Sequence, residues 1–205
     1  MKFISLLCGL ENKKVVLATQ SPRRIEMLRT VGLEFEIYPP QFEEKRQPGM
    51  KPVDYVRHNA SEKAHWVAEH TDFDLIIAAD TVVVMDGEIF EKPRNRKQAE
   101  QMLLRLSNRT HQVITGFCLK TPDQLVIDHE VTEVTFYSLT EMEVEMYLRS
   151  DEPFDKAGAY GIQGFASLFI RKISGCYFNV VGFPLGKFYQ RLKGLNICQP
   201  GHLLN

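Results

Sequence analysis

The run Ser21-Pro22-Arg23-Arg24 places a hydroxyl group and two guanidinium groups at the start of a segment with helical periodicity. The N–H groups at a helix start carry the positive end of the helix dipole, and together with arginines they bind phosphate oxygens. Taken alone, the same run is more typical of a capped helix with two solvated arginines. It therefore indicates either an anion site or an ordinary helix start.

Asp80 is the second residue whose position suggests chemistry. It lies between two apolar runs, Leu75–Ala79 and Val82–Met85, each of which is typical of a buried strand. A carboxylate inside a sheet needs a partner such as a cationic side chain or a bound metal ion. The sequence thus predicts a functional carboxylate in a central strand.

Other candidates have ordinary interpretations when each is taken alone. Lys63 is typical of a helix surface, Lys92 of an exposed loop, and Glu44 of a solvated acidic pair with Glu43. The six histidines show no metal-ligand spacing, and the glycines match neither a dinucleotide fingerprint nor a P-loop. These patterns disfavour a histidine-bound metal, a serine–histidine nucleophile, an NAD enzyme and a Walker-type NTPase.

Composition narrows the class of protein further. The 25 basic and 26 acidic side chains give a net charge of −1, which disfavours nucleic acid or a membrane surface as a partner. The four cysteines form no CxxC pair, so we expect reduced thiols, most of them buried. The N-terminal segment has neither the charge nor the cleavage site of a signal peptide, and we expect a cytoplasmic protein.

Alternating strands and helices must position these residues. A capping box at Thr140 and Glu143 starts one helix, and Asp86-Gly87 predicts a type I′ hairpin. The length fits one domain, and no linker is visible within 1–205. Periodicity predicts strands at 15–18, 35–38, 75–85, 88–90, 111–119, 125–137 and 167–173, helices at 22–31, 53–69, 97–107, 140–150 and 185–192, a long loop at 39–52, and a loop around Asn179.

Seven short motifs occur together in one order, and jointly they carry more information than any one of them. They are LATQSPRR, an acidic loop with Glu44, AADT, EKP, THQVITG, DKAGAYGIQG and NVVGFP. This ordered set resembles the Maf-type nucleotide pyrophosphatases over residues 13–192. The resemblance implies an N-terminal extension at 1–12 and a Maf-like domain at 13–205. It also implies a single α/β domain with a twisted mixed sheet flanked by helices, similar to inosine triphosphate pyrophosphatases, with a deep cleft between two lobes.

The resemblance implies hydrolysis of nucleoside triphosphates to the monophosphate and pyrophosphate with a divalent cation, Mg²⁺ or alternatively Mn²⁺. Ser21, Arg24, Lys63 and Lys92 would bind the phosphates, and Lys92 would be catalytic with Glu44 and Asp80. Glu44 and Asp80 would also lie at the metal. Whether Asp80 acts mainly as base or as ligand stays open. Homodimers are common among relatives, and the segment from Asn179 to Pro184 is expected to serve packing.

Base preference depends on three further positions in the resemblance. Arg23, Thr81 and Gln163 are similar to the residues of the subgroup that prefers dTTP and UTP. A glutamine amide can pair with a pyrimidine edge as both donor and acceptor. Two alternatives stay open: the same chemistry on another base, such as 7-methyl-GTP, CTP or a modified pyrimidine triphosphate, and a non-enzymatic nucleotide-binding regulator of cell division.

Overall fold

The structure is a computed structural model that describes residues 1–41 and 49–197. These residues form two compact units, each assembled from separate stretches of chain. The first unit contains Met1–Asp80, Gly116–His129 and the segment from Gly182 onward. The second contains Thr81–Thr115 and Glu130–Val181. Three strands, β3 (Leu75–Met85), β5 (Thr110–Lys120) and β6 (Leu125–Phe136), have residues in both units.

The strands form one mixed sheet of seven in the order β2-β1-β3-β5-β6-β7, with β4 paired to β3. Strand β1 (Val15–Ala18) runs parallel to both β2 (Glu36–Ile37) and β3. Strand β4 (Glu88–Phe90) runs antiparallel to β3, and β7 (Ile170–Ser174) runs antiparallel to β6. The α/β class and the mixed sheet are therefore confirmed.

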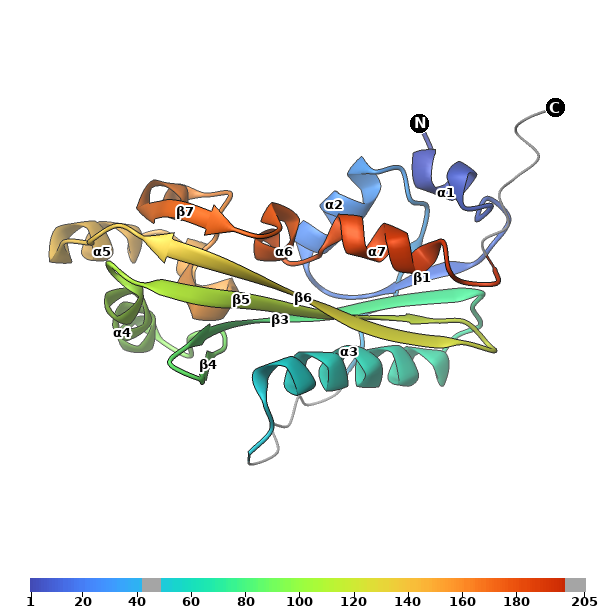
Figure 1. Cartoon of the computed structure of the whole chain (residues 1–205), viewed down its shortest axis with the longest axis horizontal. Coiled ribbons are helices and arrows are strands. Elements are labelled where there is room, and N and C mark those ends of the chain that lie inside the picture. The colour runs from blue at the N-terminus through green and yellow to red at the C-terminus, as the bar shows by residue number, and fades with distance from the viewer. Residues whose placement is uncertain (42–48, 198–205) are drawn as a thin grey trace. The chain divides into compact units, whose positions relative to one another are not determined.

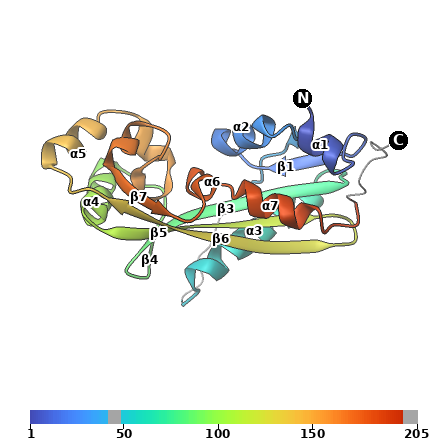
Figure 2. The same cartoon turned by 45° about the horizontal axis from the view of Figure 1, so that its top comes forward.

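In the first unit, helices cover both faces of the strands (Figure 1). Helix α3 (Pro52–Ala68) places Ala60 and Ala64 against β1, β3 and Cys118 of β5 on one face. Because side chains alternate along a strand, the adjacent Phe117 packs on the opposite face, where it meets Phe183 and through it Phe188 of α7 (Leu185–Leu192). Helices α1 (Phe3–Leu7) and α2 (Pro22–Thr30) lie on the same face as α7 (Figure 2).

Two glycines of the first unit allow close approach of backbone segments. Gly32 has a φ of +73°, and a Cβ atom there would lie 2.3 Å from the carbonyl oxygen of Met1. A Cβ atom on Gly116 of β5 would lie 2.5 Å from the carbonyl carbon of Val56, so glycine allows a close approach of α3 to the sheet at this point. Gly32 directly follows Val31, the C-cap residue of α2.

The second unit has its own hydrophobic core. Its buried residues come from α4 (Arg96–Leu106), α5 (Glu141–Tyr147) and the adjoining parts of β3, β4, β5 and β6. Three short 3₁₀ helices complete it: η1 (Glu152–Asp155), η2 (Ala157–Ala159) and η3 (Phe165–Phe169), followed by β7 and α6 (Tyr177–Val181).

Most predicted elements are confirmed, with four corrections. Residues 167–169 belong to η3, so β7 starts at Ile170, and the helix predicted at 140–150 ends at Tyr147. The segment around Asn179, predicted as a loop, is the short helix α6. Residues 3–7, given no element from the sequence, form α1. The hairpin turn and the capping box are confirmed, because Asp86 and Gly87 both have positive φ and Thr140 and Glu143 exchange the expected hydrogen bonds.

The cysteines of the described residues agree with the expected thiols. Cys8 and Cys118 are buried, Cys176 is half-buried, and none of the three forms a disulfide. Burial raises the pKa of Cys118 to about 12, so it stays a neutral thiol. No helix among residues 1–41 and 49–197 combines the length and apolar character needed to cross a lipid bilayer.

Candidate active site

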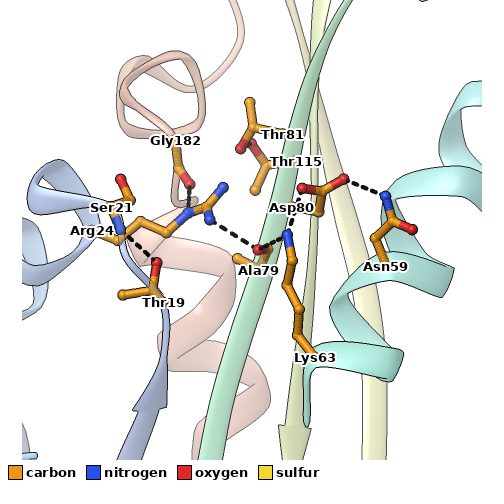
Figure 3. Close-up of polar contacts among 10 residues, drawn as sticks. All are labelled: Thr19, Ser21, Arg24, Asn59, Lys63, Ala79, Asp80, Thr81, Thr115 and Gly182. Atoms are coloured by element: carbon orange, nitrogen blue, oxygen red, sulfur yellow. Dashed lines mark hydrogen bonds and ion pairs between the residues drawn. The ribbon is translucent and has the colours of Figure 1, made fainter. Parts of the chain in front are cut away.

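Asp80 of β3 lies at the centre of a polar cluster in the first unit (Figure 3). Lys63 Nζ donates to its Oδ1 at 2.8 Å, and Asn59 Nδ2 donates to its Oδ2 at 2.9 Å. The side chains of Lys63 and Asp80 are each only 10% exposed. The predicted carboxylate in a central strand is thus confirmed, and its partner is a buried ammonium group.

These contacts keep Asp80 ionised. Burial alone would raise the pKa of Asp80, but the charge of Lys63, the hydrogen bonds from Lys63 and Asn59, and the charge of Arg24 together hold it below its usual range. Both oxygens carry negative charge at neutral pH, and each keeps acceptor capacity beyond its one hydrogen bond.

Helix α3 supplies both partners of Asp80. Asn59 and Lys63 are four residues apart, which places them on one face of the helix, and both are buried. The interpretation of Lys63 as an ordinary surface lysine is therefore wrong. Asn59 was missed by the sequence analysis, although its spacing from Lys63 within an apolar stripe was a usable signal.

Arg24, in the first turn of α2, also reaches β3. Its Nη1 donates to the carbonyl oxygen of Ala79 at 2.9 Å, and its Nε donates to the carbonyl oxygen of Gly182 at 2.9 Å. Lys63 Nζ contacts the same Ala79 oxygen at 3.4 Å. Two cationic side chains from different helices are therefore held at one point of β3, beside Asp80.

Ser21 occupies the N-cap position of α2, but its side chain makes no capping hydrogen bond. Its backbone N–H instead donates to Thr19 Oγ1 at 3.1 Å. Because Arg24 is half-buried and bonded to two carbonyl groups, the interpretation of this segment as a capped helix with two solvated arginines is wrong. Arg23, the next residue toward the helix start, is also half-buried.

Thr81 belongs to the second unit and forms a hydroxyl pair with Thr115 at 2.9 Å. The Thr115 hydroxyl lies 3.2 Å from the carbonyl oxygen of Asn179. Asn179 is fully buried, and its Nδ2 donates to the Val113 carbonyl and to Thr132 Oγ1. The expected packing role of Asn179 is confirmed.

Lys92 and Gln163 also belong to the second unit, and both side chains are exposed. The motifs that contain them are adjacent in space, because Gly158 N–H donates to the carbonyl oxygen of Glu91 at 3.2 Å. Glu44 lies outside the described residues. Within residues 1–41 and 49–197, His, Cys, Asp and Glu form no cluster of three or more that could hold a metal ion.

An α/β fold with a buried carboxylate, a lysine and an arginine beside a helix start is a scaffold suited to binding phosphates. The family model described as Maf-like protein matches residues 14–195. The chain therefore belongs to the Maf family, as the motif resemblance implied.

Curated relatives match nearly the whole chain. A protein of Bacillus cereus (strain ATCC 10987 / NRS 248) is 43% identical over 189 residues, covering 92% of this chain and 93% of its own length. One of Syntrophomonas wolfei subsp. wolfei is 44% identical over 187 residues, covering 89% and 99%. One of Bacillus anthracis (strain CDC 684 / NRRL 3495) is 43% identical over 185 residues, covering 90% and 97%. All three are named dTTP/UTP pyrophosphatase.

Proposed function

We propose that this protein hydrolyses dTTP and UTP to the nucleoside monophosphate and pyrophosphate. The observation that carries the proposal is its 43–44% identity, over about nine-tenths of the chain, to proteins named dTTP/UTP pyrophosphatase. The cluster around Asp80 supports the chemistry, because it supplies charged groups of both signs in one place. House-cleaning of nucleotide pools in the cytoplasm is the role we assign to this reaction.

Hydrolysis at the α-phosphorus requires that the triphosphate charge be neutralised and the leaving pyrophosphate stabilised. Arg24 and Lys63 supply two positive charges that contacts to the Ala79 carbonyl already orient. The start of α2 at Ser21 carries the positive end of the helix dipole, which favours phosphate oxygens. Lys92, an exposed lysine, is proposed as a further phosphate-binding and catalytic residue.

A divalent cation, Mg²⁺ or Mn²⁺, fits the donors of this site. Mg²⁺ is commonly bound by one or two carboxylates together with substrate phosphates and water, so Asp80 with Glu44 would suffice to hold it. Asp80 meets the requirement for an ionised carboxylate with acceptor capacity left on both oxygens. When bound, the cation supplies additional charge neutralisation at the phosphates.

Asp80 is better suited to be a ligand and counter-charge than a general base. A general base works best when its pKa lies near the working pH, whereas the contacts of Asp80 lower its pKa. Its two hydrogen bonds also fix the carboxylate in one orientation. We therefore assign Asp80 to holding the metal and Lys63, and leave its role as a base to Glu44 or to solvent.

Base preference for dTTP and UTP is assigned to Arg23, Thr81 and Gln163. Gln163 is exposed, so its amide is accessible to a pyrimidine edge, to which it can both donate and accept. The proposal includes an arrangement like that of the inosine triphosphate pyrophosphatases, with the nucleotide in a deep cleft, and a homodimer as the assembled state.

The first test is pyrophosphate release from dTTP, UTP, CTP, GTP, 7-methyl-GTP and ITP, with Mg²⁺ and again with EDTA. The proposal expects metal-dependent turnover that is highest with dTTP and UTP. Highest turnover with 7-methyl-GTP or CTP would overturn the base assignment alone. No turnover from folded protein would overturn the enzymatic proposal in favour of a nucleotide-binding regulator.

A matched pair of variants on α2 checks the site. Arg24→Met removes the guanidinium beside Ala79, and we expect kcat/KM for dTTP to fall roughly 100-fold or more, as when a transition-state donor is lost. Arg29→Met changes an exposed arginine in the last turn of the same helix and should retain wild-type kcat/KM. Equal losses in both variants would remove Arg24 from the phosphate site.

A further inference from the structure

Gln163 lies in a turn between η2 and η3 that one carboxylate holds in place. Glu152 Oε2 accepts the backbone N–H of Phe165 at 2.8 Å, and Oε1 accepts that of Ala166 at 3.4 Å. The hydroxyl of Tyr147, at the end of α5, donates to Oε1 at 3.0 Å. Burial, followed by the charge of Glu152, raises the pKa of Tyr147, so this hydroxyl stays a donor.

The turn lies directly on the segment that contains Glu152. A Cβ atom on Gly164 would lie 2.1 Å from Glu152 Oε2, and one on Gly161 would lie 2.6 Å from Lys156 Cε. Lys156 is itself fixed, because its ammonium group donates to the Glu152 carbonyl at 2.8 Å and pairs with Asp155. The residues on both sides of Gln163 are thus in contact with Glu152 or Lys156.

These contacts account for two glycines of the DKAGAYGIQG motif. A Cβ atom at position 164 would push the Glu152 carboxylate away from the N–H groups that follow Gln163, and one at position 161 would push the end of the Lys156 side chain. Since Gln163 is exposed, its own backbone gains little stabilisation from burial. Its position therefore depends on the anchored residues beside it.

We propose that Glu152 is a positioning residue that fixes the Gly161–Gly164 turn and thereby sets the preference for a pyrimidine nucleoside triphosphate through Gln163. The inference rests on the proposed function, because it takes Gln163 to contact the base. Glu152 does not itself touch the substrate. Its effect is exerted on the geometry of the Gln163 amide.

The test is Glu152→Gln, which keeps the size of the side chain but replaces one acceptor oxygen with an NH₂ group that cannot accept from backbone N–H. We expect kcat/KM for dTTP to fall about tenfold, mainly through a higher KM, and the dTTP-to-GTP ratio of kcat/KM to fall toward that of Gln163→Ala. Glu143→Gln is the matched control, because Glu143 also accepts a backbone N–H at a helix start in the same unit. It should leave that ratio unchanged.

The double variant Glu152→Gln/Gln163→Ala decides whether Glu152 acts through Gln163. If it does, adding Glu152→Gln to Gln163→Ala changes the dTTP-to-GTP ratio no further. Independent, multiplicative effects on that ratio would overturn the inference. An equal fall in kcat for every nucleotide, with the ratio unchanged, would overturn it as well.

The hydrogen bonds that Glu152 accepts from Phe165 and Ala166 can be tested without catalysis. Amide hydrogen exchange of residues 161–166 should be faster in Glu152→Gln than in the wild type, and unchanged in Glu143→Gln. Unchanged hydrogen exchange would overturn the role of Glu152 in holding the turn.

If wild-type protein turns over no nucleotide, the proposed function fails and the specificity role of Glu152 fails with it. If the wild type prefers dTTP and Glu152→Gln keeps the full preference, only this inference fails.

Discussion

The ion pair between Lys63 and Asp80 is almost completely removed from water, and each side chain is 10% exposed. Such a pair stabilises a fold only if hydrogen bonds offset the loss of hydration. Here Asn59 satisfies the second carboxylate oxygen, and the Ala79 carbonyl provides a further contact for the ammonium group. The arrangement keeps two opposite charges buried at one point of β3, which is useful for a site that must receive an anionic substrate.

Asp80→Asn should abolish most turnover and also weaken the fold, because it removes the carboxylate that pairs with the buried Lys63 ammonium group. The free energy of unfolding should fall by about 3 kcal/mol, the scale for removing one partner of a buried pair. Lys63→Met/Asp80→Asn should regain most of that stability while staying inactive. Urea unfolding and pyrophosphate release measure the two effects separately, and near-wild-type kcat in Asp80→Asn would remove Asp80 from the mechanism.

For single residues, the sequence indicated candidate charged side chains but not the contacts between them. Asp80 was identifiable because apolar runs flank it on both sides. The burial of Lys63 was missed, although its spacing from Asn59 and the apolar residues of α3 was a usable signal. The carbonyl groups of Ala79 and Gly182, which orient Arg24, carry no side-chain signal at all.

Strand β5 carries a buried histidine into the core of the second unit. His111 is 2% exposed, hydrogen-bonds Tyr160 at 2.7 Å, and lies edge-on to the rings of Phe136 and Tyr160. Burial lowers the pKa of His111 to about 3, so it is neutral in the folded protein at physiological pH. The imidazole of His111 therefore binds a proton much more readily in the unfolded chain than in the folded protein.

His111 should therefore make stability depend on pH. Between the ordinary pKa of about 6.5 and the folded value of about 3, only the unfolded chain binds the proton, so the contribution is complete above pH 6.5 and is lost as pH falls toward 3. His111→Gln, which can keep a hydrogen bond to Tyr160, should reduce the slope of unfolding free energy against pH by up to about 1.4 kcal/mol per pH unit.

Urea unfolding at several values between pH 7.5 and pH 4.5 measures this slope. His65→Gln, the same change at an exposed position of α3, is the control for the substitution itself. If His111→Gln leaves this slope unchanged, burial of the His111 ring does not contribute to the pH dependence of stability.

Elements with strong local signals were predictable, and those fixed by distant contacts were not. Asp86-Gly87 and the box at Thr140 determine their turn and helix start within a few residues. The η3 helix starts where Glu152 accepts the N–H of Phe165, a contact thirteen residues apart that periodicity cannot show. Likewise α6 forms around Asn179, whose amide bonds to β5 and β6.

For the molecule as a whole, the continuity of β3, β5 and β6 through both units should couple their unfolding. Trp66 is the single tryptophan, and it lies in the first unit, stacked on His70. Its fluorescence therefore reports on that unit, whereas far-UV circular dichroism reports on both. We expect the two signals to give the same denaturant midpoint, because neither unit can lose these strands without disrupting the other. A second transition seen only by circular dichroism would show independent units.

The aromatic contact from β5 to α7 has a consequence for how the protein is made. Phe117 packs against Phe183, and Phe183 against Phe188, so the aromatic contacts of β5 on this face are made with residues translated after the entire second unit. Folding from the N-terminus during synthesis therefore cannot complete this unit early, although it contains the first eighty residues. During synthesis, Phe117 of β5 lacks these aromatic contacts until α7 has been translated. In this interval the nascent chain most needs protection from aggregation.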